Sequence, residues 1–127
     1  MISESARMST AAEARFRIQT PHPTSRVVKV IELETASDHE IAALVRDVRS
    51  VDLVVMVVPA GVDAHAAAVI GQACSDARVM TTTIVVKAAR SSDAALSKTL
   101  AQVRPWSLMV VVASDHAYVD DILASLR

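Results

Sequence analysis

Leu53-Val54-Val55-Met56-Val57-Val58 is the stretch that decides how this chain folds. All of its side chains are apolar and most are β-branched, so an extended strand here has no polar face. A strand that is apolar on both faces is typical of the centre of a parallel sheet covered by helices. The stretch therefore predicts an α/β domain.

Strand and helix patterns alternate on both sides of this stretch. Apolar runs predict further strands at residues 27–33, 80–87 and 108–113, and apolar residues at helical spacing predict helices at 38–49, 66–77, 93–103 and 119–126. The order β-α-β-α-β-α-β-α predicts one three-layer, Rossmann-like α/β domain over residues 26–127, with a four-stranded, mostly parallel sheet and helices on both faces. Polar positions place strand 27–33 near an edge, and the pattern leaves the strand order open.

The first 25 residues differ from this pattern. They are rich in Ser, Ala, Thr and charged residues and end in a segment with Pro21 and Pro23, which cannot continue a helix. We expect residues 1–25 to form a loosely ordered N-terminal arm.

Charge and cysteine content restrict the classes of binding partner and the cellular location that we expect for the protein. The 127 residues carry 13 Lys and Arg against 14 Asp and Glu, a net charge of -1, so neither nucleic acid nor a membrane is an expected partner. Cys74 is the single cysteine, which excludes an intrachain disulfide. The longest uncharged apolar run, residues 53–62, is too short to span a bilayer, and no export signal is visible. A cytoplasmic location is expected.

A ligand site in such a fold would lie at the carboxyl ends of the strands, in loops 34–40, 59–65, 87–93 and 114–118. Gly61 and Gly71 are the only glycines, so neither the G-x-G-x-x-G nor the G-x-x-x-x-G-K-[ST] phosphate motif is present. Standard nucleotide binding is therefore not expected.

Four acidic residues stand where helices are expected to begin, and we interpret them as N-caps: Asp38, Asp63, Asp93 and Asp115. Residues 37–40 also have the form of a capping box. Histidines accompany three of the acids, at His39, His65 and His116. If the loops converged, these imidazoles and carboxylates would suit a divalent metal ion; the alternative is exposed histidines in first helical turns.

Two basic residues, Lys87 and Arg90, follow the predicted strand 80–87. They would either meet an anionic ligand or pair with neighbouring aspartates, and the nearby acids favour pairing. Ser114 precedes Asp115 and His116, but without a G-x-S-x-G elbow this adjacency does not predict a hydrolytic triad.

The helix predicted at 66–77 carries a second stripe of small residues, and the stripe starts just before the helix: Ala64, Ala67, Ala68, Gly71 and Ser75. The stripe predicts close packing against another helix, from the N-terminal arm or a second subunit. The alternative is an alanine-rich helix selected for helix propensity.

Residues 39–117 resemble the second half of the nucleotide-binding domain of the FtsZ/tubulin family in the order and spacing of their segments. The similar segments are Glu40-Ile41-Ala42-Ala43-Leu44, Val51-Asp52-Leu53-Val54-Val55-Met56-Val57, Ala66-Ala67-Ala68-Val69-Ile70, Thr82-Thr83-Ile84-Val85-Val86-Lys87 and Leu108-Met109-Val110-Val111-Val112 with Ser114-Asp115. Where that family has its glycine-rich phosphate loop, this chain has Ala60-Gly61-Val62-Asp63-Ala64-His65-Ala66. The resemblance therefore implies a nucleotide-binding architecture whose phosphate loop is missing.

The sequence favours a non-catalytic binding or self-association module with a second copy or another protein as partner. The alternative is a degenerate site for a nucleotide or small ligand, with candidate residues Gly61, Asp63, His65, Lys87, Arg90, Ser114, Asp115 and His116. If the ligand is a nucleotide, Gly61 lets the backbone approach it, Lys87 or Arg90 contacts a phosphate, and the Ser114 hydroxyl contacts the base or ribose. A second alternative is a metal-dependent enzyme that uses His65 and His116 with Asp63 or Asp115.

Overall fold

The structure, a computed structural model, describes residues 26–126 and confirms the alternation of strands and helices. The predicted arm, residues 1–25, lies outside the described residues. The elements are β1 (Val28–Glu32), α2 (Asp38–Asp47), η1 (Val48–Ser50), β2 (Leu53–Pro59), α3 (Ala66–Ala77), β3 (Met80–Val86), α4 (Asp93–Val103), η2 (Arg104–Trp106), β4 (Met109–Ala113) and α5 (His116–Leu126).

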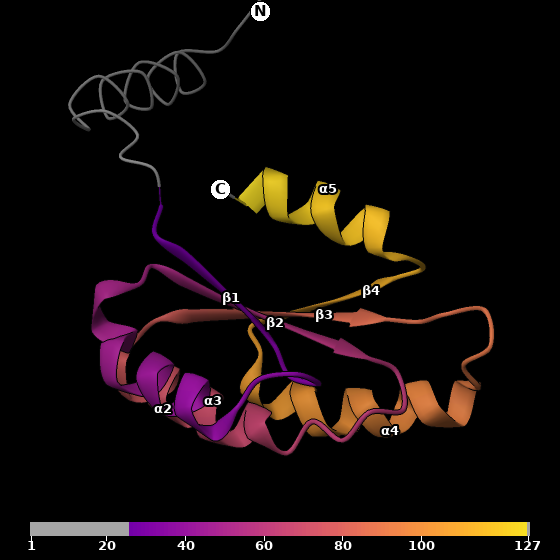
Figure 1. Ribbon diagram of the computed structural model, residues 1–127, viewed down its shortest axis with the longest axis horizontal. Helices are drawn as coiled ribbons and strands as arrows, with labels where there is room; N and C mark the ends of the chain where they lie inside the picture. Colours follow the sequence, from indigo (N-terminus) through magenta and orange to yellow (C-terminus); the bar gives the residue numbers. More distant parts are fainter. Residues whose placement is uncertain (1–25, 127) are drawn as a thin grey trace, which may run out of the picture.

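The sheet is parallel throughout, and its strands follow the order of the sequence, β1-β2-β3-β4. Each crossover joins neighbouring strands with the same hand, so α2, α3 and α4 all cover one face. Helix α5 follows the last strand and lies on the opposite face (Figure 1). The predicted three-layer, Rossmann-like domain is confirmed, and its two helical layers are unequal.

β2 lies inside the sheet and is buried from Leu53 to Val58, as its apolar sequence predicts. Its side chains divide between two hydrophobic clusters. Val54, Met56 and Val58 join the cluster with α2, α3 and α4, whereas alternate residues join the smaller cluster with α5. β1 lies at an edge of the sheet, as predicted.

The N-cap prediction is confirmed only for Asp115, whose carboxylate accepts the Tyr118 N–H at 3.0 Å. Ser37 and Ser92 cap α2 and α4, so Asp38 and Asp93 are instead the first residues of those helices. Asp63 does not cap α3, because the chain makes another turn before the helix begins at Ala66. A serine hydroxyl one residue earlier satisfies the same N–H groups.

Part of the small-residue stripe of α3 is covered from within the domain, whereas Ser75 at its end is exposed. Ala67 and Gly71 are buried, and a Cβ on Gly71 would overlap the side chain of Trp106 in η2. The prediction that the arm or a second subunit covers this stripe is therefore wrong at Gly71. With sequential strand order, α4 and η2 lie beside α3 on the same face.

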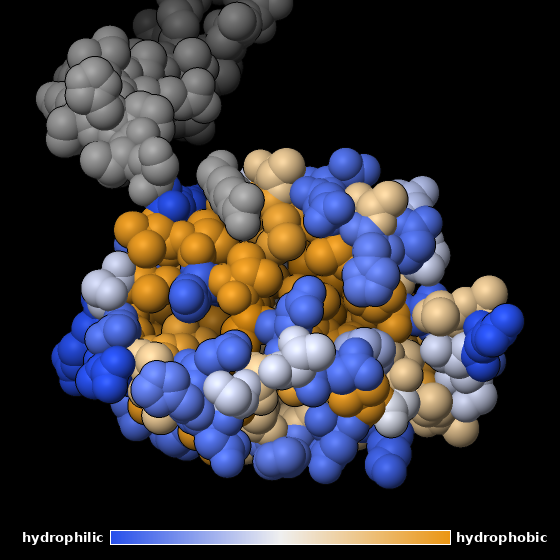
Figure 2. All heavy atoms as spheres, viewed as in Figure 1, coloured by the Kyte–Doolittle hydropathy of each residue, from blue (hydrophilic) through white to orange (hydrophobic). Residues whose placement is uncertain are grey.

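Figure 2 shows hydrophobic side chains at the level of the sheet, between α5 above and the α2–α4 layer below. Val28 and Val30 of β1 pack against the α5 cluster but are only partly buried. Among the helices of residues 26–126, none has the length and apolar character that crossing a membrane requires.

Candidate functional site

The loop between β2 and α3, where the resemblance would place phosphate, is bound to helix α4. Gly61 adopts φ +91°, a conformation that favours glycine, and its N–H donates to Thr99 Oγ1 at 2.9 Å. The same hydroxyl lies 3.5 Å from the Val62 carbonyl oxygen, to which it donates. The backbone donor that a phosphate would need at Gly61 is therefore already paired.

Asp63 and His65 belong to the same attachment. Gln102 of α4 accepts the Ala64 N–H at 2.9 Å and donates to Asp63 Oδ1 at 2.8 Å. Asp63 also accepts the His65 N–H and lies 3.3 Å from the exposed imidazole. The Gln102 hydrogen bond is the main reason that the pKa of Asp63 lies below its usual value. Sequence reasoning missed Thr99 and Gln102. The signal that could have indicated them is a polar residue placed at the inward spacing of an amphipathic helix.

Of the two basic residues after β3, the structure pairs one with a neighbouring aspartate, as expected. Lys87 Nζ lies 3.1 Å from Asp93 Oδ1, at the start of α4. Arg90 is exposed in the turn between them. Pairing with a neighbouring aspartate is thus confirmed for Lys87.

Ser114, Asp115 and His116 lie where β4 turns toward α5, whereas the preceding strand β3 leads to α4 on the other face (Figure 1). Loops that diverge in this way from neighbouring parallel strands are where α/β folds open a ligand crevice. Here the Lys87 N–H donates to the Ala113 carbonyl oxygen at 2.8 Å. The cavity beside His116 measures only about 30 Å³, far below the several hundred Å³ of ordinary ligand pockets.

The three loop histidines lie in separate places. His39 borders a groove along β1, His65 precedes α3 and His116 begins α5. In the part of the chain that the structure describes, no three His, Cys, Asp or Glu side chains gather where they could hold a metal ion.

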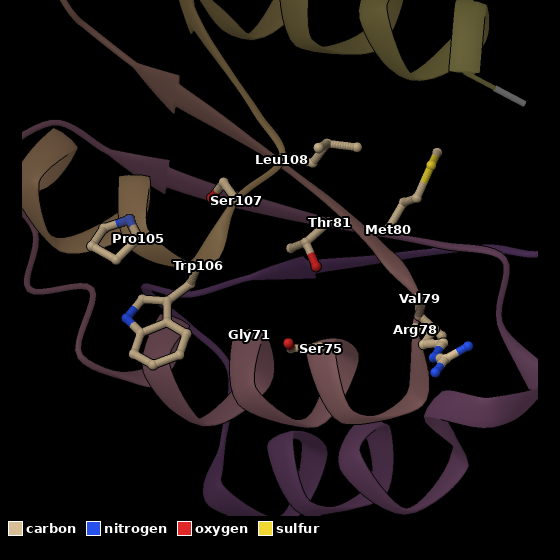
Figure 3. A pocket seen from close by; sticks show the side chains of 10 residues that line it. All are labelled: Gly71, Ser75, Arg78, Val79, Met80, Thr81, Pro105, Trp106, Ser107 and Leu108. Atoms are coloured by element: carbon tan, nitrogen blue, oxygen red, sulfur yellow. The ribbon is translucent and has the colours of Figure 1, made fainter.

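A larger hollow, of about 420 Å³, lies at the opposite end of the sheet, where β3 and β4 begin. Figure 3 shows Trp106 against α3 at Gly71, with Ser75 and Thr81 across the hollow from each other. Arg78 lies at its end with φ 59°, a left-handed conformation that is uncommon for arginine. Leu108 and Met80 border it and are exposed.

The edge of β4, which no other strand of residues 26–126 pairs with, is apolar and exposed beside this hollow. Leu108 is 74% exposed, Met109 45% and Val112 47%, and Tyr118 of α5 beside them is 56% exposed. A groove of about 280 Å³ runs between β4 and α5 and is lined by Val111, Val112, Ala113, Ser114, Tyr118 and Ile122. Sequence reasoning missed this edge because an apolar run alone does not distinguish an inner strand from an edge strand.

Over residues 26–126, fold and surface together define a small parallel α/β domain with β4 as an uncharged sheet edge. Comparison with protein-family models, curated proteins and solved structures finds no match. The resemblance to the FtsZ/tubulin family therefore stays a prediction from the order of the segments.

Proposed function

We propose that this domain is a non-catalytic self-association module and that the edge of β4 is its docking surface. The contrast between the two sheet edges carries the proposal. β1 bears Lys29 and Glu32, and the Asp52 carboxylate accepts the Val27 N–H at 2.8 Å. β4 and its flanks carry no charged residue from Pro105 to Ser114. Charges on an edge strand oppose pairing with another chain, so β1 is protected and β4 is not.

The groove along β1 strengthens this contrast. It measures about 600 Å³ and is bordered by charged or titratable side chains: Lys29, Glu32, His39, Glu40 and Asp47. The smaller groove beside β4 is lined by apolar residues of the strand, with Ser114 just after the strand and Tyr118 of α5 as its polar residues. Apolar surface of this kind at an unpaired edge is typical of a protein interface.

A second copy of the chain is the occupant that the charges fit best. Because β4 is uncharged, two copies can pair along it without bringing like charges together. The flanks are complementary, since Arg104 precedes the strand and Asp115 follows it. Backbone pairing along an exposed edge supplies hydrogen bonds, and the exposed side chains supply apolar contact.

The loops at the carboxyl end of the sheet favour binding over catalysis. Polar groups of three candidate residues are already bound within the domain: those of Gly61, Asp63 and Lys87. A cytoplasmic location is part of the proposal, because the single cysteine, Cys74, cannot form a disulfide within the chain. Its thiol is buried, and burial raises its pKa.

Sedimentation velocity of the full chain over a dilution series tests the proposal. The wild type is expected to dimerise, and Val112→Lys is expected to shift the equilibrium to monomer by placing a charge on the β4 edge. Val27→Lys is the matched control, because Val27 is similarly exposed, at 52%, but lies at the β1 edge. A wild type that stays monomeric, or a dimer that Val112→Lys leaves intact, would overturn the proposal.

A further inference from the structure

We propose that two copies of the chain pair antiparallel through β4 about a two-fold axis at Val111, with Val110 of each copy exchanging backbone hydrogen bonds with Val112 of the other. This inference rests on the proposed self-association and adds its geometry. It is carried by the directions of the backbone N–H and C=O groups of β4, which the pairing with β3 fixes.

The backbone groups of β4 point alternately toward β3 and away from it. Lys87 donates its N–H to the Ala113 carbonyl oxygen at 2.8 Å, so the polar backbone groups of Ala113 face β3. The N–H and C=O of one strand residue point to the same side, and those of the next residue point to the other. Val111 therefore also faces β3, whereas Val110 and Val112 present both of their backbone groups at the outer edge.

The direction of the pairing follows from these outward groups. In an antiparallel pair, two directly opposite residues exchange both of their N–H···O=C bonds, so outward residues of the two copies must face each other. In a parallel pair, each residue bonds to the two residues that flank its neighbour, so two identical edges would have to shift by one residue. Copies shifted in this way are not equivalent. The antiparallel arrangement makes them equivalent, as in most dimers of identical chains.

The outward residues also fix the register. An axis at Val111 places Val110 of each copy opposite Val112 of the other, so the outward backbone groups of both residues are bonded. An axis at Val110 would place Val112 opposite Leu108, whose N–H is already bonded to β3. An axis at Val112 would place Val110 opposite Ser114, which lies beyond the end of β4. The axis at Val111 is therefore the one that keeps the pairing within the strand.

The side chains of β4 agree with this register on both faces of the sheet. Val111 lies beside Ile84 of the α5 cluster, whereas Val112 lies beside Val85 of the cluster on the helix-rich face. An axis at Val111 therefore packs Val111 against its own copy on the α5 face. On the other face, Val110 and Val112 pack against each other twice. Cross-strand pairs of β-branched apolar residues stabilise a sheet.

Met109 gains a partner in the same arrangement. It shares the α5 face with Val111, is 45% exposed, and would lie opposite Ala113 of the second copy. Ala113 lines the groove of about 280 Å³ beside Tyr118. The methionine of one copy would therefore enter the groove of the other and contact the tyrosine ring, a favourable contact between a thioether and an aromatic ring.

The arrangement ends at two copies. The two four-stranded sheets join into one sheet whose outer edges are both β1, with its charged residues Lys29 and Glu32. Charged residues on an edge strand oppose further pairing, so we expect a closed dimer rather than a filament.

Disulfide trapping tests the register. Opposite residues whose backbone groups point away from each other have Cα atoms about 4.5 Å apart, within the range that a disulfide spans. Val111→Cys is therefore expected to form a disulfide between the copies under mild oxidation. Val112→Cys is the matched control: Val112 is more exposed than Val111, but its two copies lie on a diagonal, about 7–8 Å apart, and are expected to stay reduced. The native Cys74 is buried and does not compete.

Amide hydrogen exchange of the wild type gives a second readout that needs no substitution. The N–H groups of Val110 and Val112 face outward in the monomer and are bonded in the dimer. Their exchange is therefore expected to slow at least about 10-fold between dilute protein and concentrations at which the dimer predominates. The N–H of Val111, which faces β3, is expected to be protected at every concentration.

The outcomes separate the two proposals. A wild type that stays monomeric overturns the self-association together with its register. A wild-type dimer overturns the register alone if Val112→Cys cross-links as readily as Val111→Cys, or if the exchange of Val110 and Val112 does not depend on concentration. Sedimentation velocity under reducing conditions establishes that each variant is dimeric before oxidation. If Val111→Cys is monomeric there, the exchange of the wild type decides the register.

Discussion

Trp106 packs against helix α3 at Gly71, the position where that helix has no side chain. A Cβ added to Gly71 would overlap Trp106 Cβ and lie 3.0 Å from Cγ. The contact joins η2 to α3 and fixes where the chain enters β4. The glycine is therefore required by the approach of the tryptophan rather than by its backbone angles.

Replacing Gly71 with alanine should destabilise the domain. In a helix interior, Gly→Ala normally stabilises by about 1 kcal/mol. Here the overlap with Trp106 should reverse the sign, with a net cost of about 1–3 kcal/mol as for other overpacked sites. Urea unfolding of Gly71→Ala, Trp106→Gly and the double variant measures it. The cost of Gly71→Ala should shrink when Trp106 is glycine; an equal cost in both backgrounds would contradict the explanation.

Arg78→Gly should stabilise the domain by about 0.5–1 kcal/mol, because glycine adopts the left-handed conformation at the end of α3 without steric cost. The Arg78 N–H bonds to the carbonyl oxygens of Cys74 and Ser75, and those bonds survive the substitution. Arg78→Ala is the control, since it removes the guanidinium but keeps the Cβ. Equal melting temperatures for the two variants would assign the effect to the lost charge.

Strands and helices were predictable because their apolar periods are local. Residues 53–58 are buried on both faces, and the helical spacing places most inward residues correctly, although Val69 of α3 is 53% exposed. The strand order was not predictable. An apolar sequence shows that a strand is covered on both faces, but not which strands lie beside it. A sequential order and an order that doubles back within the sheet satisfy the same apolar pattern.

The candidate site was predictable in its position and not in its contacts. Loop 59–65 does lie at the carboxyl end of β2, and Lys87 does pair with an aspartate. The partners of the loop, Thr99 and Gln102, lie nearly 40 residues away in sequence, on a helix whose side of the sheet depends on the strand order. Contacts that follow from topology leave no local signal.

Thr99→Val should cost about 1–3 kcal/mol, because it leaves the Gly61 N–H without its hydroxyl acceptor while the shape of the side chain is kept. Thr99 is only 1% exposed, so water cannot easily take the place of the hydroxyl. The midpoint of urea unfolding gives the size of the loss. Ser97→Ala, an exposed change on the same helix, should stay within about 0.5 kcal/mol. Comparable losses in the two variants would show that the hydroxyl does not hold the loop.

Asp63 should make the domain more sensitive to acid. Its pKa in the folded state is lowered, mainly by the Gln102 amide, so its carboxylate adds stability above the ordinary pKa. That contribution is lost as the pH falls through the lower folded-state pKa.

Carbon-13 NMR titration of the Asp63 carboxyl group measures its folded-state pKa directly. Gln102→Met should raise it toward the ordinary value, because the amide donor is gone. Asp63→Asn should flatten the fall in unfolding free energy below about pH 4, whereas Asp120→Asn, at an exposed site on α5, is the matched control. An Asp63 pKa that Gln102→Met does not move would mean that the amide hydrogen bond does not stabilise the charged form.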